Sequence, residues 1–141
     1  MAVNTSPTYT LTPNIGFANL IAANANTALD GTGTVSTVFT AGADGAVVNN
    51  LIVKSSTTTA TSAAGVLRIW INNGSTNGTA TNNTLVREYV LSAVTASATA
   101  STLNYEFPLN FELPAGYKII VTVATMAANT GWQFTCTGAD Y

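Results

Sequence analysis

The stretch YEFPLNFEL, residues 105 to 113, decides the fold class of this chain. Every second residue in it is aromatic or aliphatic: Tyr105, Phe107, Leu109, Phe111 and Leu113. Because successive side chains of an extended chain point to opposite faces, the stretch predicts a β-strand with one apolar face and one polar face. Pro108 has no N–H to donate to a β-ladder, so we expect an edge position or a bend near it, in one strand or in two short ones.

The flanking segments continue this pattern in both directions. Downstream, LPAG (113–116) is a turn signal, and YKIIVTVAT (117–125) and WQFTCT (132–137) alternate again. Upstream, four segments have strand length and many β-branched residues: TVSTVFTA (34–41), VVNNLIVK (47–54), GVLRIWI (65–71) and TLVREYVLSAV (84–94). The sequence therefore predicts an all-β protein, an antiparallel β-sandwich of jelly-roll-like type with seven to eight strands. Alternation does not give the strand order, so an immunoglobulin-like sandwich stays open.

The tract SSTTTATSAAG (55–65) has the composition of an interdomain linker. The part of the chain before it, however, supplies about two strands and a sparse N-terminal segment, and two strands are not stable alone. A chain of 141 residues also matches one ordinary domain. We therefore predict a loop inside a single sandwich of residues 27–141, preceded by an N-terminal arm with a possible first strand in residues 1–26.

Charge is scarce along the whole chain. Charged residues make up 7% of the sequence and the net charge is −2, compared with about 25% charged residues in typical soluble domains. The four cations, Lys54, Arg68, Arg87 and Lys118, are scattered, so nucleic acid and anionic membranes are not expected partners. The N-terminus lacks the basic start and apolar run of a signal peptide, which predicts synthesis and assembly in a cytoplasm.

The residue inventory argues against an enzyme. The chain has no histidine, which excludes Ser-His-Asp and Cys-His sites, and Cys136 is expected to be a small buried hydrophobe. Glu106 and Glu112 share one face of the 105–113 segment but lie about 20 Å apart along an extended chain, too far for a glycosidase pair. No catalytic residue, cofactor or metal is predicted.

Three aspartates are candidate calcium ligands. Asp30, Asp44 and Asp140 occur at or near glycine-rich turns, including GTGT (31–34) and GADG (42–45). Aspartate is common in such turns because its side chain accepts hydrogen bonds from the nearby backbone. Turn formation is therefore the favoured interpretation of these residues, and a calcium site is the alternative.

Two further features bear on recognition. Trp70 and Trp132 lie inside predicted strands, which favours a place in the core or in a subunit interface over stacking on a sugar. The segment NNGSTNGTATNN (72–83) is predicted to be an exposed loop carrying Asn72, Asn73, Asn77 and Asn82.

Three stretches together carry a family resemblance: TALDGTGTVSTVFTAGADG (27–45), TTTATSAAGVLRIWI (57–71) and LPAGYKIIVTVATMAANTGWQFTCTGADY (113–141). They resemble small virion accessory proteins of tailed bacteriophages, of the capsid decoration or head cement type. The resemblance covers about residues 25–141 and rests on scaffold motifs. The 72–83 loop is longer and richer in asparagine than expected for the group.

The resemblance implies a structural protein, often a homotrimer, that binds the major capsid protein on the outside of the assembled head and stabilises it. It would be made in the host cytoplasm and located on the capsid surface of the virion. FANLIAAN (17–24), with Phe17, Leu20 and Ile21, is then a capsid-docking arm that adds to a sheet edge of the capsid protein or of a neighbouring subunit, or else it is the sandwich's own first strand. The alternative function is a receptor- or carbohydrate-binding module of a phage fibre or tail.

Overall fold

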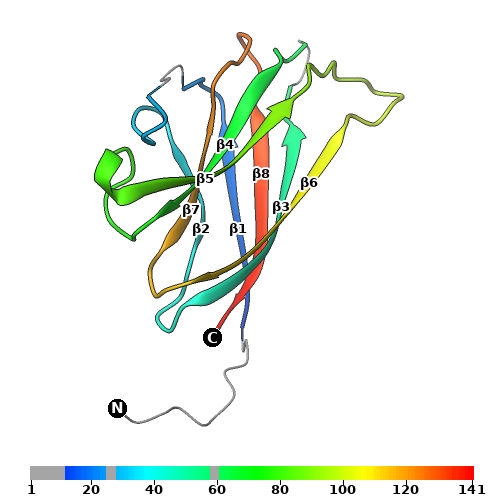
Figure 1. The fold of residues 1–141 in the computed structure, drawn as a ribbon. Helices are drawn as coiled ribbons and strands as arrows, with labels where there is room; N and C mark the ends of the chain where they lie inside the picture. Colours follow the sequence, from blue (N-terminus) through cyan, green and yellow to red (C-terminus); the bar gives the residue numbers. More distant parts are fainter. Residues whose placement is uncertain (1–11, 25–27, 58–60) are drawn as a thin grey trace, which may run out of the picture.

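The computed structural model describes residues 12–24, 28–57 and 61–141. Within them, eight strands form two four-stranded antiparallel sheets that pack as a sandwich (Figure 1). Sheet A contains, in spatial order, β1 (Thr12–Leu20), β8 (Trp132–Asp140), β3 (Ala46–Ser55) and β6 (Asn104–Leu113). Sheet B contains β2 (Ser36–Thr40), β7 (Lys118–Val123), β4 (Gly65–Asn72) and β5 (Asn83–Leu91). A short 3-10 helix, η1 (Ala80–Asn82), precedes β5.

The strand order is that of a jelly roll. The strands pair antiparallel from the two ends of the chain toward its middle. The first strand pairs with the last, the second with the second to last, and so on: β1 with β8, β2 with β7, β3 with β6, and β4 with β5. The chain is therefore a ribbon that doubles back between β4 and β5. Rolling this ribbon places β8 beside β3 and β7 beside β4, which closes the two sheets. The predicted sandwich is confirmed, and its order excludes the immunoglobulin-like alternative.

The core lies between the sheets and is built by the predicted alternation. Its fully buried members include Leu51 and Val53 of β3, Leu67 and Ile69 of β4, and Phe134 of β8. On either side of these positions along each strand, side chains turn away from the core. A jelly roll of this size thus buries one continuous apolar cluster.

Strand β6 shows the consequences of Pro108. It is one strand of ten residues, not two, and it lies at the edge of sheet A. Leu109 is buried, whereas Pro108 and Asn110 are exposed. The pairing with β3 shifts register beside Pro108, and Asn110 adopts a positive φ of 53° there. Both the expected edge position and the expected bend are therefore observed.

The two sides of the sandwich are closed differently. On one side β1 lies so close to β2 that a Cβ on Gly16 would be 1.9 Å from the Val38 carbonyl oxygen, which only glycine permits. Asn14 also donates from Nδ2 to the Thr40 carbonyl oxygen at 3.1 Å. On the other side the rings of Tyr89 on β5 and Phe107 on β6 stack with centroids 3.8 Å apart. Close backbone contacts between β1 and β2 therefore join the two sheets on one side of the sandwich, and stacked aromatic rings of β5 and β6 join them on the other.

The segments outside the strands follow from this topology. The linker-like tract runs from β3 in sheet A to β4 in sheet B, and residues 58–60 of it lie outside the described residues. The predicted boundary between residues 26 and 27 also lies outside them. In the described ranges, no helix has both the length and the apolar character needed to span a membrane.

Candidate docking surface

The carboxylates do not form a reactive or metal-binding cluster in the part of the chain that the structure describes. No group of three or more His, Cys, Asp or Glu residues lies close enough there to hold a metal ion. Glu106 and Glu112 are exposed on β6, and Glu106 accepts from Asn50 Nδ2 at 2.8 Å. These two glutamates have the solvated positions expected from the sequence.

The aspartates near the turns bind the protein's own backbone. Asp30 Oδ1 accepts from the backbone N–H of Thr32 at 3.0 Å and from its hydroxyl at 2.7 Å. Asp140 accepts from the Gly42 N–H at 3.0 Å and from Asn14 Nδ2 at 2.9 Å. Asp140 thereby ties the end of β8 to β1 and to the turn after β2. These contacts fit the turn-forming interpretation of Asp30 and Asp140.

Cys136 is fully buried on the inner face of β8. Its burial raises the pKa of the thiol to about 12, because the low-dielectric core disfavours the thiolate. The predicted role as a small buried hydrophobe is confirmed, and the thiol is held in its unreactive protonated form.

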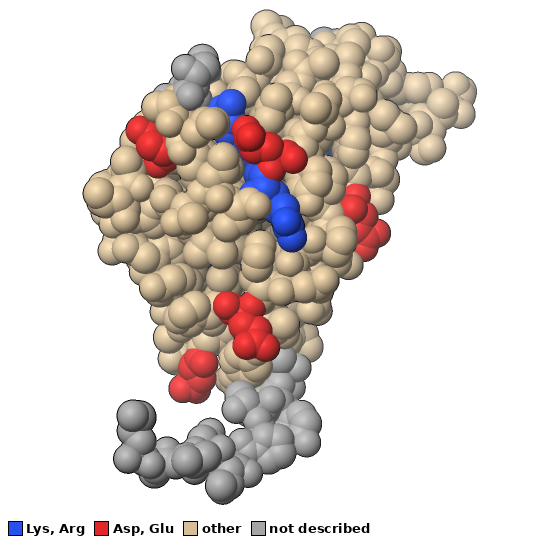
Figure 2. Space-filling view, in the orientation of Figure 1, with Lys and Arg blue, Asp and Glu red and all other residues tan. Residues whose placement is uncertain are grey.

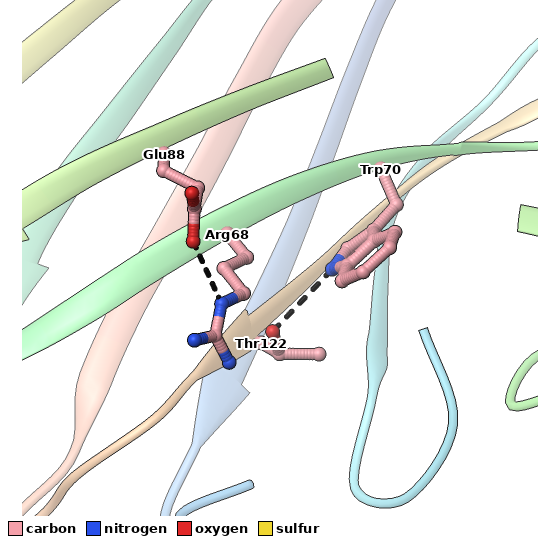
Figure 3. Close-up of polar contacts among 4 residues, drawn as sticks. All are labelled: Arg68, Trp70, Glu88 and Thr122. Carbon is pink, nitrogen blue, oxygen red and sulfur yellow. Dashed lines mark hydrogen bonds and ion pairs between the residues drawn. The ribbon is translucent and has the colours of Figure 1, made fainter. Parts of the chain in front are cut away.

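Both tryptophans are buried, and they lie in different places. Trp132 belongs to the core between the sheets, 6.3 Å from the Tyr105 ring between centroids. Trp70 points to the other side of sheet B, where Ile120 and Thr122 are also buried, and its Nε1 donates to Thr122 Oγ1 at 3.4 Å (Figure 3). Neither indole is available to stack on a sugar ring.

The same face of sheet B carries an ion pair. Arg68 of β4 donates from Nε to Oε1 of Glu88, which lies opposite it on the neighbouring strand β5, at 2.9 Å (Figure 3). Figure 2 shows one face of the molecule, on which charged groups are few and most of the surface is uncharged. A partner that recognises charge would therefore find few anchors on the face in view.

The 72–83 loop is held by asparagine side chains, which corrects one expectation. Asn72 is fully buried, not exposed. Its Nδ2 donates to Asn83 Oδ1 at 2.7 Å, and its Oδ1 accepts from the Gly74 N–H at 2.9 Å. Asn72 is the last residue of β4, so its side chain points into the base of the loop and connects the two strands that the loop joins.

The other three asparagines lie within the loop and are also hydrogen-bonded. Asn73 is exposed and its Oδ1 accepts from the Ser75 N–H at 3.2 Å. Asn77 is half-buried and donates to Thr37 Oγ1 of β2 at 2.7 Å. Asn82 donates to the Thr76 carbonyl oxygen at 3.1 Å. The loop is therefore folded on itself and against β2, with much of its amide capacity already used.

The exposed apolar residues of β1 and of the segment after it form the clearest surface feature. Ile15, Phe17 and Ile21 are 64%, 80% and 76% exposed. In the pairing of β1 with β8, Ile15 lies opposite Thr137, Phe17 opposite Thr135, and Asn19 opposite Gln133. We call this surface the β1 face, comprising Ile15, Phe17, Asn19 and Ile21 with Gln133, Thr135 and Thr137 of β8.

The β1 face is hollowed and uncharged. Phe17, Asn19, Gln133 and Thr135 line one shallow hollow, and a second, lined by Asn19, Ile21, Gly131 and Gln133, lies next to it. None of the residues that define the face carries a charge. Such a surface suits an apolar or neutral protein segment and offers nothing to an ionic ligand.

The segment predicted to dock is divided between this face and the core. Phe17 and Leu20 lie in β1, so the segment up to Leu20 belongs to the protein's own first strand. Phe17 and Ile21 point outward, but Leu20 is 3% exposed, packs in the core and lies opposite Trp132. Leu20 is therefore a core residue and not a docking residue.

Ile15 was missed by the sequence interpretation. In β1 the odd-numbered residues from Ile15 to Asn19 face outward, and the inward positions are Asn14, Gly16, Ala18 and Leu20. Its alternation with Phe17 was the available signal. Identifying it required the knowledge that residues 12–20 form a strand in which Ile15 and Phe17 point away from the core.

Comparisons with known proteins do not assign this chain to a family. No protein-family model and no curated protein matches the sequence. Among solved structures, the chain is similar to a chain of infectious bursal disease virus, Gx strain, with a TM-score of 0.41 and 14% identity over 99% of this chain and 37% of that one. For the Gt strain of the same virus the TM-score is 0.30, with 14% identity over 97% and 37%. The chain spans little more than a third of either, and at these TM-scores the likenesses carry no argument about function.

Proposed function

We propose that this chain is a structural virion protein of a tailed bacteriophage, a decoration or cement protein that binds the outside of the assembled head and stabilises it. The observation that carries the proposal is the β1 face, with Phe17 80% and Ile21 76% exposed on a surface without charge. Large exposed apolar side chains gathered in one place are typical of contact surfaces. The jelly roll is compatible with this role but does not specify it, because lectins and cupins share the architecture.

The mechanism of stabilisation would be ordinary linkage. A protein that binds only the expanded shell lowers the free energy of that state relative to any ruptured one. At a free concentration of 100 times Kd, each occupied site contributes about 2.7 kcal/mol. Many weak, neutral contacts repeated over a shell therefore suffice, and no catalytic group or cofactor is needed.

Phe17 and Ile21 are the proposed docking residues, and the major capsid protein or a neighbouring copy is the partner. A trimeric state is part of the proposal through the family resemblance alone. The sparse charge supports a role without nucleic acid or membrane as partner.

The carbohydrate-binding alternative has no supporting observation among the described residues. Trp70 and Trp132 are buried, and the asparagines of the 72–83 loop have their side chains engaged in hydrogen bonds. We therefore do not propose it.

The deciding experiment mixes purified protein with undecorated expanded heads of the parent phage and counts bound copies as the protein concentration rises. We expect saturable binding at a fixed multiple of the symmetry sites of the shell. The double substitution Phe17→Ser with Ile21→Ser should weaken binding by at least about tenfold, equivalent to about 1.4 kcal/mol. Val90→Ser is the matched control, because Val90 is 73% exposed on β5 and lies outside the β1 face.

Two results would contradict the proposal. The first is an absence of binding to heads at any concentration, after which a glycan panel would be the next experiment. The second is a double variant that binds as tightly as the control, which would show that the β1 face does not make the contact.

A further inference from the structure

Sheet edges are where a β-sandwich is exposed to pairing with another chain, and this protein has four: β1 and β6 in sheet A, and β2 and β5 in sheet B. An edge strand presents unpaired N–H and C=O groups, which form a template for a further strand. Proteins usually block such edges with short strands, charges, proline or bulges. The four edges can be compared for these features.

Three of the edges carry such features. Strand β2 is only five residues long, and its register with β7 shifts between Thr37 and Phe39. Strand β5 shifts register with β4 and carries Arg87 and Glu88. Strand β6 has the shift beside Pro108 and carries Glu106 and Glu112. Each of these edges is therefore poorly suited to accept another strand.

The edge of β1 lacks these features along most of its length. The strand has nine residues, and its register with β8 is continuous from Thr12 to Leu20. No charged residue occurs in it, and its single proline, Pro13, is next to its first residue. In the described residues, β1 is a ladder partner of β8 alone. The inner face of β1 lies against β2 at Asn14 and Gly16, and its outer face carries the exposed Ile15 and Phe17. An edge without charges, bulges or a central proline is a site for strand addition.

The sequence of β1 indicates which strand would fit. If a second β1 pairs antiparallel with Gly16 opposite Gly16, Ile15 of each copy lies opposite Phe17 of the other. Directly opposite residues have Cβ atoms about 4.5–5.5 Å apart on one face, where an aliphatic and an aromatic side chain pack well. Ile15 of each copy then packs beside Phe17 of the other on the same face of the joined sheet.

Charge and symmetry favour the same occupant. Because β1 has no charged residue, two copies bring no like charges together. The contact would be isologous, so a single pair uses both edges and cannot grow into a fibre through this contact. A charged partner strand would leave its charges against a neutral, apolar face.

We propose that the free edge of β1 pairs antiparallel with β1 of a second copy of this chain, centred on Gly16. This inference rests on the proposed role of the β1 face as a contact surface, and it names the partner at that face. On a capsid, the pair would connect neighbouring decoration subunits. If the chain also forms a trimer, each trimer has three β1 edges and the contact would connect neighbouring trimers.

The first test measures the molar mass of the free protein by light scattering over a concentration series. We expect the wild type to reach twice the mass of Phe17→Lys and of Ile15→Lys at the same concentration if the smaller unit is a monomer, and at least twice their mass if it is a trimer with three β1 edges. Val90→Lys places the same new charge on another edge strand and should keep the wild-type mass. Native fluorescence of the buried tryptophans checks that each variant is folded.

The second test checks the register. Chains with Ile15→Cys and chains with Phe17→Cys are mixed and oxidised, and cross-linked dimers are counted by mass spectrometry. Equal amounts that pair at random already give twice as many mixed dimers as dimers of either variant with itself. We expect mixed cross-links well above this twofold excess, because position 15 of one copy lies directly opposite position 17 of the other, whereas two copies of the same variant place their cysteines diagonally. Cys136 does not interfere, since it is buried in the core.

Two outcomes would overturn the inference: equal masses for the wild type and both lysine variants, or cross-links with no preference for the mixed pair. The inference and the proposed function fail independently of each other. If the molar mass halves in the lysine variants and the wild type does not bind heads, the β1 pairing is retained and decoration is rejected. If head binding depends on Phe17 and Ile21 but the wild type and the lysine variants have equal masses, decoration is retained and the pairing is rejected. The β1 face would then contact the capsid shell.

Discussion

At the scale of single residues, Cys136 shows how burial controls chemistry in this protein. The thiol is surrounded by the core between β8 and its neighbours, and the pKa is raised to about 12 because the thiolate would lose its hydration there. The unfolded chain would release the same proton near the ordinary value of 9.0. Folding and the protonation of this thiol are therefore linked.

This linkage predicts a loss of stability at alkaline pH. Above pH 9.0 the unfolded state holds fewer protons than the folded state, so the free energy of unfolding falls as the pH rises toward about 12. The slope from this one group approaches about 1.4 kcal/mol per pH unit. The measurement is urea unfolding of the wild type and of Cys136→Ala between pH 7 and pH 11, with the free energy of unfolding extrapolated linearly to zero urea.

The difference between the two proteins isolates the thiol, since all other titrating groups are shared. It should be constant well below pH 9.0, the ordinary pKa of this thiol, and shrink as the pH rises above that value. A difference that stays constant over the whole range would show that the folded thiol titrates normally.

The burial of a residue could be predicted where the apolar side chains of a strand face the core, and not in β1, where Ile15 and Phe17 face solvent. The burial of Trp132 and Cys136 follows from their place in the alternating run at the end of the chain. In β1 the Val38 carbonyl lies so close to Gly16 that no larger side chain fits at that inward position, and Ile15 and Phe17 on either side of it face outward. Size and hydrophobicity alone would have put these two residues in the core.

At the scale of elements, proline and asparagine were informative to different degrees. Pro108 predicted an edge and a bend for β6 because a missing N–H has a local consequence. The asparagines predicted the loop between β4 and β5, since Asn and Gly favour turns. They did not reveal that Asn72 is buried, because its partners Asn83 and Gly74 meet it only after both strands have formed.

The loop therefore offers a matched pair of substitutions. Asn72→Ala removes two hydrogen bonds in a buried place and leaves the Asn83 amide and the Gly74 N–H without that partner, so it should cost about 1–3 kcal/mol of stability. Asn73→Ala changes an exposed neighbour and should stay within about 0.5 kcal/mol. Chemical denaturation compares the two, and equal costs would contradict the buried role of Asn72.

At the scale of the whole molecule, the sandwich could be predicted but its order could not. Alternation reports on the two faces of each strand and says nothing about which strands are neighbours. In a jelly roll most neighbours are far apart in sequence, such as Thr12 and Asp140 at the ends of the β1–β8 pair. Only the β4–β5 pair is a local hairpin, and its turn was the part of the topology visible in the sequence.

These distant pairings predict slow folding. Closing long loops costs chain entropy before the contacts between strands are gained, so all-β domains of this type fold in roughly milliseconds to seconds. Stopped-flow refolding followed by the fluorescence of the buried tryptophans measures the rate. Refolding in microseconds would mean that local contacts, absent from this strand order, direct the process.

The position of β8 between β1 and β3 also has a consequence for the chain during translation. Of the eight strands, β8 leaves the ribosome last, and until then β1 has no ladder partner and one side of β3 is unpaired. A nascent or truncated chain that stops before Trp132 cannot complete sheet A, and its apolar interior stays open to chaperones and proteases. Among the eight strands, the closure of sheet A therefore waits for the last one to be translated, although its neighbours β1 and β3 are made early.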